Sequence, residues 1–280
     1  MRHFFAGMTA LLALAAMVAV PARATEATFE RDLTVSGRVD LAINNGSGFI
    51  HLTNGPAGHV HIFARVHSSW GSSDDAVQDV AAHPPIQQTG NIVRIGPIHR
   101  DLGNVNIDYE IQAPADAYLD AGSGSGNITD DGVGANAKLS TGSGSIQATG
   151  LKGGFTVGTG SGNIDAEQVS PGDVKANTGS GSIELKNVHG GLHAGTGSGH
   201  VKVEGAPTAS WLIHTGSGSV ELWTENAGLT LDASTGSGGI HTDREISSQG
   251  SVERHHLKGT IGGGGPEVRV ETGSGSIRVH

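Results

Sequence analysis

The side chains in this sequence best suited to bind a metal or to change charge near neutral pH are its 15 histidines, a high number for 280 residues. Nine of them are candidates for a metal cluster and fall into three groups: His51, His59 and His61; His189, His193, His200 and His214; and His255 and His256. His59 and His61 share one strand face by parity and could chelate one ion. A zinc site needs three or four converging ligands, however, and neither HExxH nor a comparable spacing is present. We therefore expect no bound metal, only surface histidines whose charge would vary with pH.

Two carboxylates, Asp165 and Glu184, indicate a second kind of chemistry. If the repeats described below stack on one another, these two groups lie one repeat apart, close to the separation of about 5 Å between the carboxyls of retaining glycosidases. Lys202 and Glu221 continue the same column, which favours an outer ladder of charges. A carbohydrate-active enzyme that uses Asp165 and Glu184 is the alternative, although such enzymes usually build a cleft from longer loops than these.

Surface binding is the third possibility. Trp223 points outward by strand parity and, near Leu212, could form a patch for sugar stacking or protein contact, whereas Trp211 is predicted to lie in the core. His193 and His214 fall on one outer face of adjacent repeats, though at different positions. The weak candidates for surface binding are thus Trp223, Leu212, His193, His214, Asp165 and Glu184.

Glycine-rich loops are also found in phosphate and calcium sites. The sequence contains neither GxGxxG nor GxxxxGK[ST], and its loops recur instead of joining one strand to one helix. Calcium-binding solenoid repeats place an aspartate two residues after the last glycine, because a hard cation needs charged oxygen ligands, and Ile or Val stands there in this chain. We therefore expect no cofactor and no catalytic residues.

The composition indicates a folded β protein. Glycine accounts for 46 of 280 residues, proline for 9 and cysteine for none. Collagen needs glycine at every third position, a helical bundle avoids glycine, and a disulfide scaffold needs cysteine. The 36% hydrophobic and 16% charged residues are also wrong for a highly charged disordered chain.

Residues 1–24 are typical of a secretory signal peptide. Arg2 and His3 precede an apolar run from Ala10 to Val20, and Pro21-Ala22-Arg23-Ala24 ends in a small-x-small cleavage site. Cleavage after Ala24 would leave a mature chain without Met or Cys and with a net charge of 15 − 27 = −12. That acidity argues against nucleic acid and anionic membrane surfaces. No transmembrane segment is predicted in the mature chain, which we expect to be exported to the periplasm or cell surface.

An internal repeat dominates the rest of the chain. The phrase Thr-Gly-Ser-Gly-x-(Ile/Val) ends at Ile146, Ile164, Ile183, Val201, Val220, Ile240 and Ile277, in steps of 18, 19, 18, 19, 20 and 37 residues, and a variant leads into Ile128. The last step is about twice as long as the others, which predicts a degenerate copy of the repeat near Ile261. A weaker copy of the repeat runs early in the chain, from Asn45 to Ile50. Two short stretches of each repeat alternate apolar and polar residues with period two, which predicts two strands per repeat.

Such a repeat cannot bury its own inner face, so the copies must stack. A meander of antiparallel hairpins and a parallel solenoid both allow this, and the constant step favours the solenoid. Close approach of backbones and positive φ would then require glycine at each corner, and the Thr and Ser hydroxyls would hydrogen-bond along the stack. The corner glycines are Gly142, Gly144, Gly160, Gly162, Gly179, Gly181, Gly197, Gly199, Gly216, Gly218, Gly273 and Gly275.

The N-terminal part of the mature chain is less regular. Residues 39–43, 60–64 and 105–111 alternate as strands, and Ser72 to Ala82 is suited to one short helix that ends before Pro84-Pro85. We interpret 25–115 as irregular first coils, 116–280 as the regular solenoid, and 25–280 as one continuous domain. A separate small β domain at the N-terminus is the alternative.

The signal peptide, the segment Ile107-Asp-Tyr-Glu-Ile-Gln-Ala-Pro114, the recurrent Thr-Gly-Ser-Gly-x-Ile and the closing stretch from Gly263 to Ile277 together resemble a widespread bacterial family, the "putative adhesin" family, a domain of unknown function with β-strand repeats. The resemblance covers nearly all of the mature chain. It implies an all-β, extracytoplasmic, right-handed parallel β-solenoid (β-helix), and it carries over no catalytic residues. The step of the repeat predicts about 18–19-residue coils for this solenoid.

The function expected from the sequence is a non-enzymatic, exported, adhesin-like scaffold or binding module at the bacterial cell envelope. An envelope protein or glycan is the expected kind of partner. The alternatives are a carbohydrate-active solenoid enzyme and a metal- or pH-responsive envelope protein that acts through surface histidines.

Overall fold

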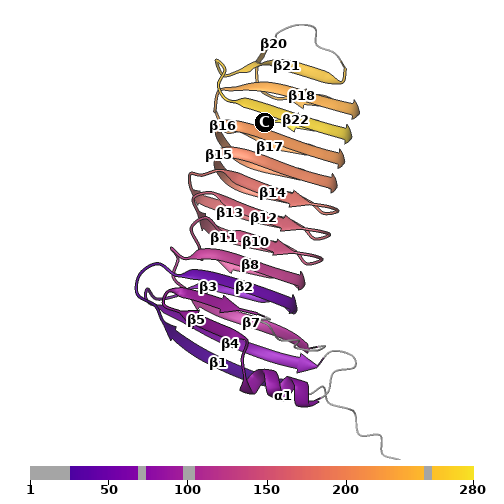
Figure 1. Cartoon of the computed structure of the whole chain (residues 1–280). Coiled ribbons are helices and arrows are strands. Elements are labelled where there is room, and N and C mark those ends of the chain that lie inside the picture. The colour runs from indigo at the N-terminus through magenta and orange to yellow at the C-terminus, as the bar shows by residue number, and fades with distance from the viewer. Residues whose placement is uncertain (1–25, 69–73, 97–104, 249–253) are drawn as a thin grey trace, which may run out of the picture.

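The structure, a computed structural model, describes residues 26–68, 74–96, 105–248 and 254–280. The expected signal peptide lies outside these residues. Within them the chain is all-β apart from one short helix, and its strands stack into an elongated column (Figure 1).

Two parallel ladders build the column. The first ladder consists, in spatial order, of β6 (Ile92–Ile95), β2 (Asp40–Ser47), β8 (Tyr118–Ser125), β10 (Lys138–Thr141), β12 (Phe155–Thr159), β14 (Val174–Thr178), the second halves of β15 (Ile183–Ser198) and β16 (Val201–Ser217), β22 (Glu267–Ser274) and β18 (Leu229–Ser237). The second consists of β7 (Val105–Ala113), β3 (Ile50–Asn54), β9 (Ile128–Asp131), β11 (Ile146–Lys152), β13 (Ile164–Ser170), the first halves of β15 and β16, β17 (Val220–Trp223), β23 (Ile277–Val279) and β19 (Ile240–Thr242).

The pairing within the ladders confirms stacked coils and excludes the hairpin meander for the repeats. Ile146 pairs in parallel with Ile164, its counterpart in the next repeat of the sequence. The next register partners, Ile183, Val201 and Val220, are the counterparts in the three repeats that follow. Each coil therefore contributes one strand to each ladder, with the Thr-Gly-Ser-Gly corner between the two strands.

At the C-terminal end the coils do not follow the order of the sequence. Val220 pairs with Ile277, and Ile277 in turn pairs with Ile240, so the last coil, β22 and β23, lies between the two coils that precede it in sequence (Figure 1). No copy of the corner lies near Ile261, because β21 (His256–Ile261) runs antiparallel to both β18 and β20 (Ile246–Ser248). The last repeat carries the same Thr-Gly-Ser-Gly corner as the others and apolar residues at the same inner positions, so it fits between two coils as well as at the end of the stack.

At the N-terminal end the early copy of the repeat does form a coil, and Ile50 pairs with Ile128. The segments predicted as strands lie in β2, β4 (His59–Ser68) and β7, and the predicted helix is α1 (Asp74–Ala82). The interpretation of the whole segment as coils was wrong, however. β1 (Glu26–Thr34) pairs antiparallel with β4, β4 with β7, and β5 (Ile86–Thr89) with β6. We call β1, β4, α1 and β5 the N-terminal cap and β20 and β21 the C-terminal cap.

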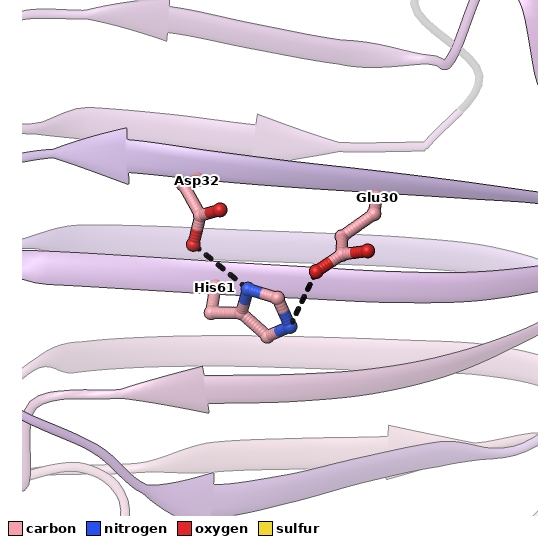
Figure 2. Close-up of side chains that lie close together, drawn as sticks. All are labelled: Glu30, Asp32 and His61. Atoms are coloured by element: carbon pink, nitrogen blue, oxygen red, sulfur yellow. Dashed lines mark hydrogen bonds and ion pairs between the residues drawn. The ribbon is translucent and has the colours of Figure 1, made fainter.

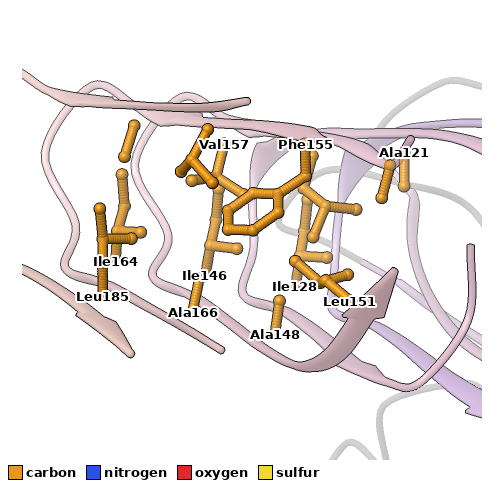
Figure 3. Close-up of a cluster of buried hydrophobic side chains, with 14 of the residues drawn as sticks. Ala121, Ile128, Ile146, Ala148, Leu151, Phe155, Val157, Ile164, Ala166 and Leu185 are labelled. Atoms are coloured by element: carbon orange, nitrogen blue, oxygen red, sulfur yellow. The ribbon is translucent and has the colours of Figure 1, made fainter. Parts of the chain in front are cut away.

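The core is a set of apolar columns along the axis of the stack. Inward residues of successive coils lie over one another, as Ile128, Ile146 and Ile164 do in Figure 3. Trp211 is buried, as predicted, and its Nε1–H donates to the carbonyl of Gly190 at 2.9 Å. At the N-terminal end, α1 packs on β1 and β4 and buries Val77 and Val80. Burial of apolar surface in these columns is the main stabilising term, at about 25 cal/mol per Å².

The corners are joined by hydroxyl hydrogen bonds along the stack, as the sequence predicts. Thr159 Oγ1 donates to the carbonyl of Gly144 at 2.7 Å and accepts the amide of Gly162 at 3.1 Å. The equivalent donors to the neighbouring corner are Thr141, Thr178, Thr196, Thr215, Thr272 and Thr235.

Close approach of neighbouring coils, more than positive φ, explains the corner glycines. A Cβ added at Gly162 would overlap the carbonyl group of Gly144 in the next coil. Among the twelve predicted corner glycines φ is positive at Gly199, Gly218 and Gly275, where it is 159°, 158° and 147°. The expectation of positive φ therefore holds at these three glycines and fails at the other nine, while the expectation of close backbones was right.

Candidate functional site

The outer face of the second ladder carries a continuous column of polar and charged side chains. Its members, in spatial order, are Gln147, Asp165, Glu184, Lys202, Glu221, Arg278 and His241. The insertion of the last coil places Arg278 between Glu221 and His241. Opposite charges thus alternate from Glu184 to Arg278 along this column.

Asp165 and Glu184 are register partners, as predicted. Lys186 Nζ lies 3.5 Å from Asp165 and 3.4 Å from Glu184, and Lys202 Nζ lies 3.3 Å from Glu184. Burial opposes ionisation of Glu184, but the hydrogen bond from Lys202 and the charges of Lys186 and Lys202 outweigh it and lower the pKa of Glu184 below its ordinary value. A general acid for glycoside hydrolysis needs the opposite shift, so this pair fits the charge ladder better than the enzyme.

The predicted patch of Trp223 and Leu212 does not exist. Leu212 pairs with His193 in the first ladder, whereas Trp223 pairs with Glu204 in the second. The two side chains therefore point outward from different sides of the coil. Both are partly exposed, at 37% for Leu212 and 44% for Trp223.

Beside Leu212, the structure brings His193 and His214 into contact although they occupy different register positions. Their rings meet edge to face, with centroids 5.6 Å apart. The ring of His214 lies so close to Gly195 that a Cβ at that glycine would collide with it. These two histidines form a small ring pair on the outer face of the first ladder.

Trp223 has a different partner, the imidazole of His280. The two rings stack with centroids 4.1 Å apart and an angle of 15°. His280 Nδ1 lies 2.7 Å from Asp243 Oδ2, and its Nε2 lies 3.2 Å from Glu221 Oε1. An imidazole held between two carboxylates thus fixes the last coil to its neighbours.

A second imidazole between two carboxylates lies in the N-terminal cap (Figure 2). His61 Nδ1 is 2.8 Å from Asp32 Oδ1, and its Nε2 is 3.6 Å from Glu30 Oε1. Within the described part of the chain, these are the only three side chains of metal-ligand type whose ligand atoms all lie within 4.8 Å of one another. Asp32 faces Nδ1 of the ring, and Glu30 faces Nε2. A metal ion bound to one ring nitrogen would therefore meet only one of the two carboxylates, unless the His61 ring rotated.

Sequence reasoning paired His61 with His59 and missed Glu30 and Asp32. The antiparallel pairing of β1 with β4 sets His61 opposite Asp32 and His59 opposite Thr34, and no pattern in the sequence indicates this pairing. We call the two groups, Glu30–His61–Asp32 and Glu221–His280–Asp243, the carboxylate–imidazole clamps.

The other predicted histidines are distributed singly along the stack. His51 lies 3.1 Å from Asp131, His189 Nδ1 lies 2.8 Å from the carbonyl of Asn187, and His200 Nδ1 accepts the amide of Ser219 at 3.2 Å. His256 lies 3.0 Å from Asp232, and this hydrogen bond, with the charge of Lys258, lowers the pKa of Asp232 despite its partial burial. His255 is exposed to solvent.

One titratable group lies inside the core. Asp130 is fully buried in β9, where it points inward between Leu52 and Ala148. Its Oδ1 accepts the amide of Val133 at 2.9 Å, and its Oδ2 has no hydrogen-bond partner among the described residues. Burial raises the pKa of Asp130 to about 7, although the Val133 hydrogen bond lowers it. Sequence reasoning missed this residue, because it occupies a position that alternation reserves for apolar side chains.

No helix among the described residues has both the length and the apolar character that a membrane crossing requires.

Comparison with known families gives a match over almost the whole chain. The family described as Toastrack DUF4097 matches residues 18–280. No match to the sequence was found among curated proteins.

Several solved structures are similar to this chain at low identity. A "putative adhesin" from Bacteroides fragilis is 12% identical, with 91% of this chain and 97% of that chain covered and a TM-score of 0.38. A "putative adhesin" from Parabacteroides distasonis is 11% identical, with 91% and 97% covered and a TM-score of 0.34. A "putative cell adhesion protein" from Clostridium sporogenes is 16% identical, with 90% and 99% covered and a TM-score of 0.26. These TM-scores are low, and the family assignment rests on the match across residues 18–280.

Proposed function

The chain belongs to the Toastrack DUF4097 family, and from this premise we propose that it is a non-enzymatic, adhesin-like binding module at the bacterial cell envelope. The observation that carries the proposal is the outer surface of the stack. Matched positions of successive coils present side chains about 4.8 Å apart along both ladders, which suits a rigid surface for an extended partner.

The chemistry of the paired carboxylates supports a binding role over a hydrolytic one. Lys186 bridges Asp165 and Glu184, and the pKa of Glu184 is lowered. The exported chain, screened against envelope glycans and envelope proteins, should bind a partner without consuming it. Turnover of a polysaccharide that is lost in the Glu184→Gln variant would overturn the proposal.

Export is part of the same proposal. Residues 1–24 act as a signal peptide, and the exported chain begins at Thr25. N-terminal sequencing of the protein from the periplasmic or secreted fraction tests this, since a start at Met1 would contradict it.

We further propose that 25–280 form one domain and that the coil is right-handed, with one repeat of the sequence per turn, as the sequence resemblance implies. A crystal structure of the exported chain would decide the handedness. Limited proteolysis that releases a stable fragment ending near residue 115 would contradict the single domain.

A further inference from the structure

A shallow groove crosses four coils on the outer face of the first ladder. Its volume is about 600 Å³, and its polar lining consists of Asn136, Lys138, Thr156, Asp173, Lys175 and His193. Lys138, Thr156, Lys175 and His193 are successive register partners, so the groove runs along the axis of the stack.

The groove exists because long and short residues alternate from coil to coil. Lys138 and Lys175, two coils or about 10 Å apart, flank the short side chain of Thr156. In the adjacent column, Gly154 and Gly191 alternate with Asn136 and Asp173 along the same lining. One unit of a ligand chain can therefore enter the recess over Thr156, between Lys138 and Lys175.

Both charge signs occur in the groove. Lys175 is exposed and has no ion-pair partner among the described residues, whereas Lys138 lies 3.0 Å from Asp120, outside the lining. Asp173 Oδ1 accepts the amide of Gly191 at 2.8 Å, so this carboxylate is held in place in the lining of the groove. The lining thus offers an unpaired cation for an anionic group, and carboxylate, amide and hydroxyl groups for ligand hydroxyls.

The geometry points to an acidic polysaccharide, a hydroxyl-rich chain with carboxylates at intervals, as the ligand of this groove. The inference rests on the proposed function and names the substrate class that the binding module takes. Lys175, assisted by Lys138, binds the ligand carboxylates, and Asp173, Asn136 and Thr156 hydrogen-bond to the sugar hydroxyls.

An extended acidic peptide fits the groove less well. A peptide would add to a sheet through its backbone, but the strands under the groove already pair on both sides, as β12 does with β10 and β14. An acidic peptide such as poly-glutamate also offers no hydroxyls to Asp173, whereas a sugar chain does. The mixed lining therefore favours the glycan.

The test is a binding titration of the exported full chain with three probes: an oligomer of galacturonic acid, its carboxyl-reduced neutral counterpart, and poly-glutamate. We expect the uronate oligomer to bind best. Lys175→Glu should weaken its binding at least about fivefold, and Thr156→Trp, which fills the recess without a change of charge, at least about tenfold.

Two matched variants control for charge and for bulk. Lys152→Glu changes an exposed lysine outside the groove, and Gln147→Trp places the same bulk on the exposed face of the other ladder; each should alter the uronate affinity less than about twofold. Equal binding of poly-glutamate, or equal effects of the control and groove variants, would overturn the inference. If the chain bound another envelope component but no uronate, only this inference would fall, whereas a chain that bound nothing in either assay would remove the proposed function as well.

Discussion

The regular coils and the two caps are held together in different ways. In the coils, each backbone pairs with an equivalent backbone, each inner residue meets an equivalent residue, and a threonine hydroxyl ties each corner to the next. In the caps the strands run antiparallel, and side chains from distant segments meet in pairs such as His61 with Asp32. Repetition therefore stabilises the middle of the molecule, and specific contacts stabilise its ends.

This difference explains why the stack does not continue indefinitely. A parallel coil exposes a strand edge that could pair with another chain. β4 and β1 cover the edge of β7 at one end, and β21 covers the edge of β18 at the other. Variants placed in the coils and in the caps can sharpen this comparison.

A side chain at a corner glycine should have the largest effect. In Gly162→Ala the new Cβ overlaps the backbone of Gly144 in the next coil, so we expect a loss of at least about 4 kcal/mol in the free energy of unfolding, or no folded protein. Gly46→Ala is the control, because a Cβ there meets nothing within 4 Å. Urea denaturation measures both, and similar stabilities of the two variants would contradict the close packing of the coils.

Asp130 should make the stability of the stack depend on pH. Its pKa of about 7 in the folded state exceeds the ordinary value of 3.8, so the folded state binds the proton more tightly. The contribution of this group to the free energy of unfolding is therefore fully present below about pH 4 and is lost as the pH rises through 7. Between pH 5 and pH 8 the loss is on the order of 3 kcal/mol. Denaturation of the wild type and of Asp130→Asn over this range tests the effect. An unchanged pH dependence in the variant would show that Asp130 is not its source.

The threonine ladder should contribute less than these two features. Thr159→Val removes the hydrogen bonds to Gly144 and from Gly162, so we expect a loss of about 2 kcal/mol. Thr230→Val, next to the C-terminal cap, removes one exposed bond to Gly265 and should cost about 0.5 kcal/mol. Equal losses in thermal denaturation would mean that the buried corner hydroxyls contribute no more than an exposed one.

The carboxylate–imidazole clamp at His280 should have the smallest effect on stability, because its groups are partly exposed. His280→Gln should cost less than about 1 kcal/mol. The variant also removes the ring stacked on Trp223, so the fluorescence of this tryptophan should change, while His200→Gln should leave it unaltered. An unchanged emission spectrum in His280→Gln would contradict the stacked geometry.

Prediction from sequence succeeded where the residues repeat. Alternation and a constant step were enough to predict that Ile146 lies next to Ile164, that Trp211 is buried and that the threonines bond along the stack. These features depend on local pattern alone.

Prediction failed where identical motifs compete or where distant segments meet. The last repeat has the same corner as the others and apolar residues at the same inner positions, so the pattern cannot reveal that Ile277 lies between Val220 and Ile240. The contacts of His61 with Asp32 and of His280 with Trp223 depend on strand pairings in which no residue pattern repeats. Of the candidate site, the column of Asp165 and Glu184 was predictable and the clamps were not.

The insertion of the last coil is the most distinctive element of this architecture, and the absence of cysteine allows it to be tested directly. Two double variants are compared under oxidising conditions: Glu221→Cys with Arg278→Cys, and Glu221→Cys with His241→Cys. The first pair are register partners, within the Cα separation of about 4.4–6.8 Å that a disulfide needs, while the second pair lie two coils or about 10 Å apart. We predict a disulfide in the first variant and free thiols in the second. A disulfide between positions 221 and 241 instead would show that the coils follow the order of the sequence, and would contradict the inserted coil.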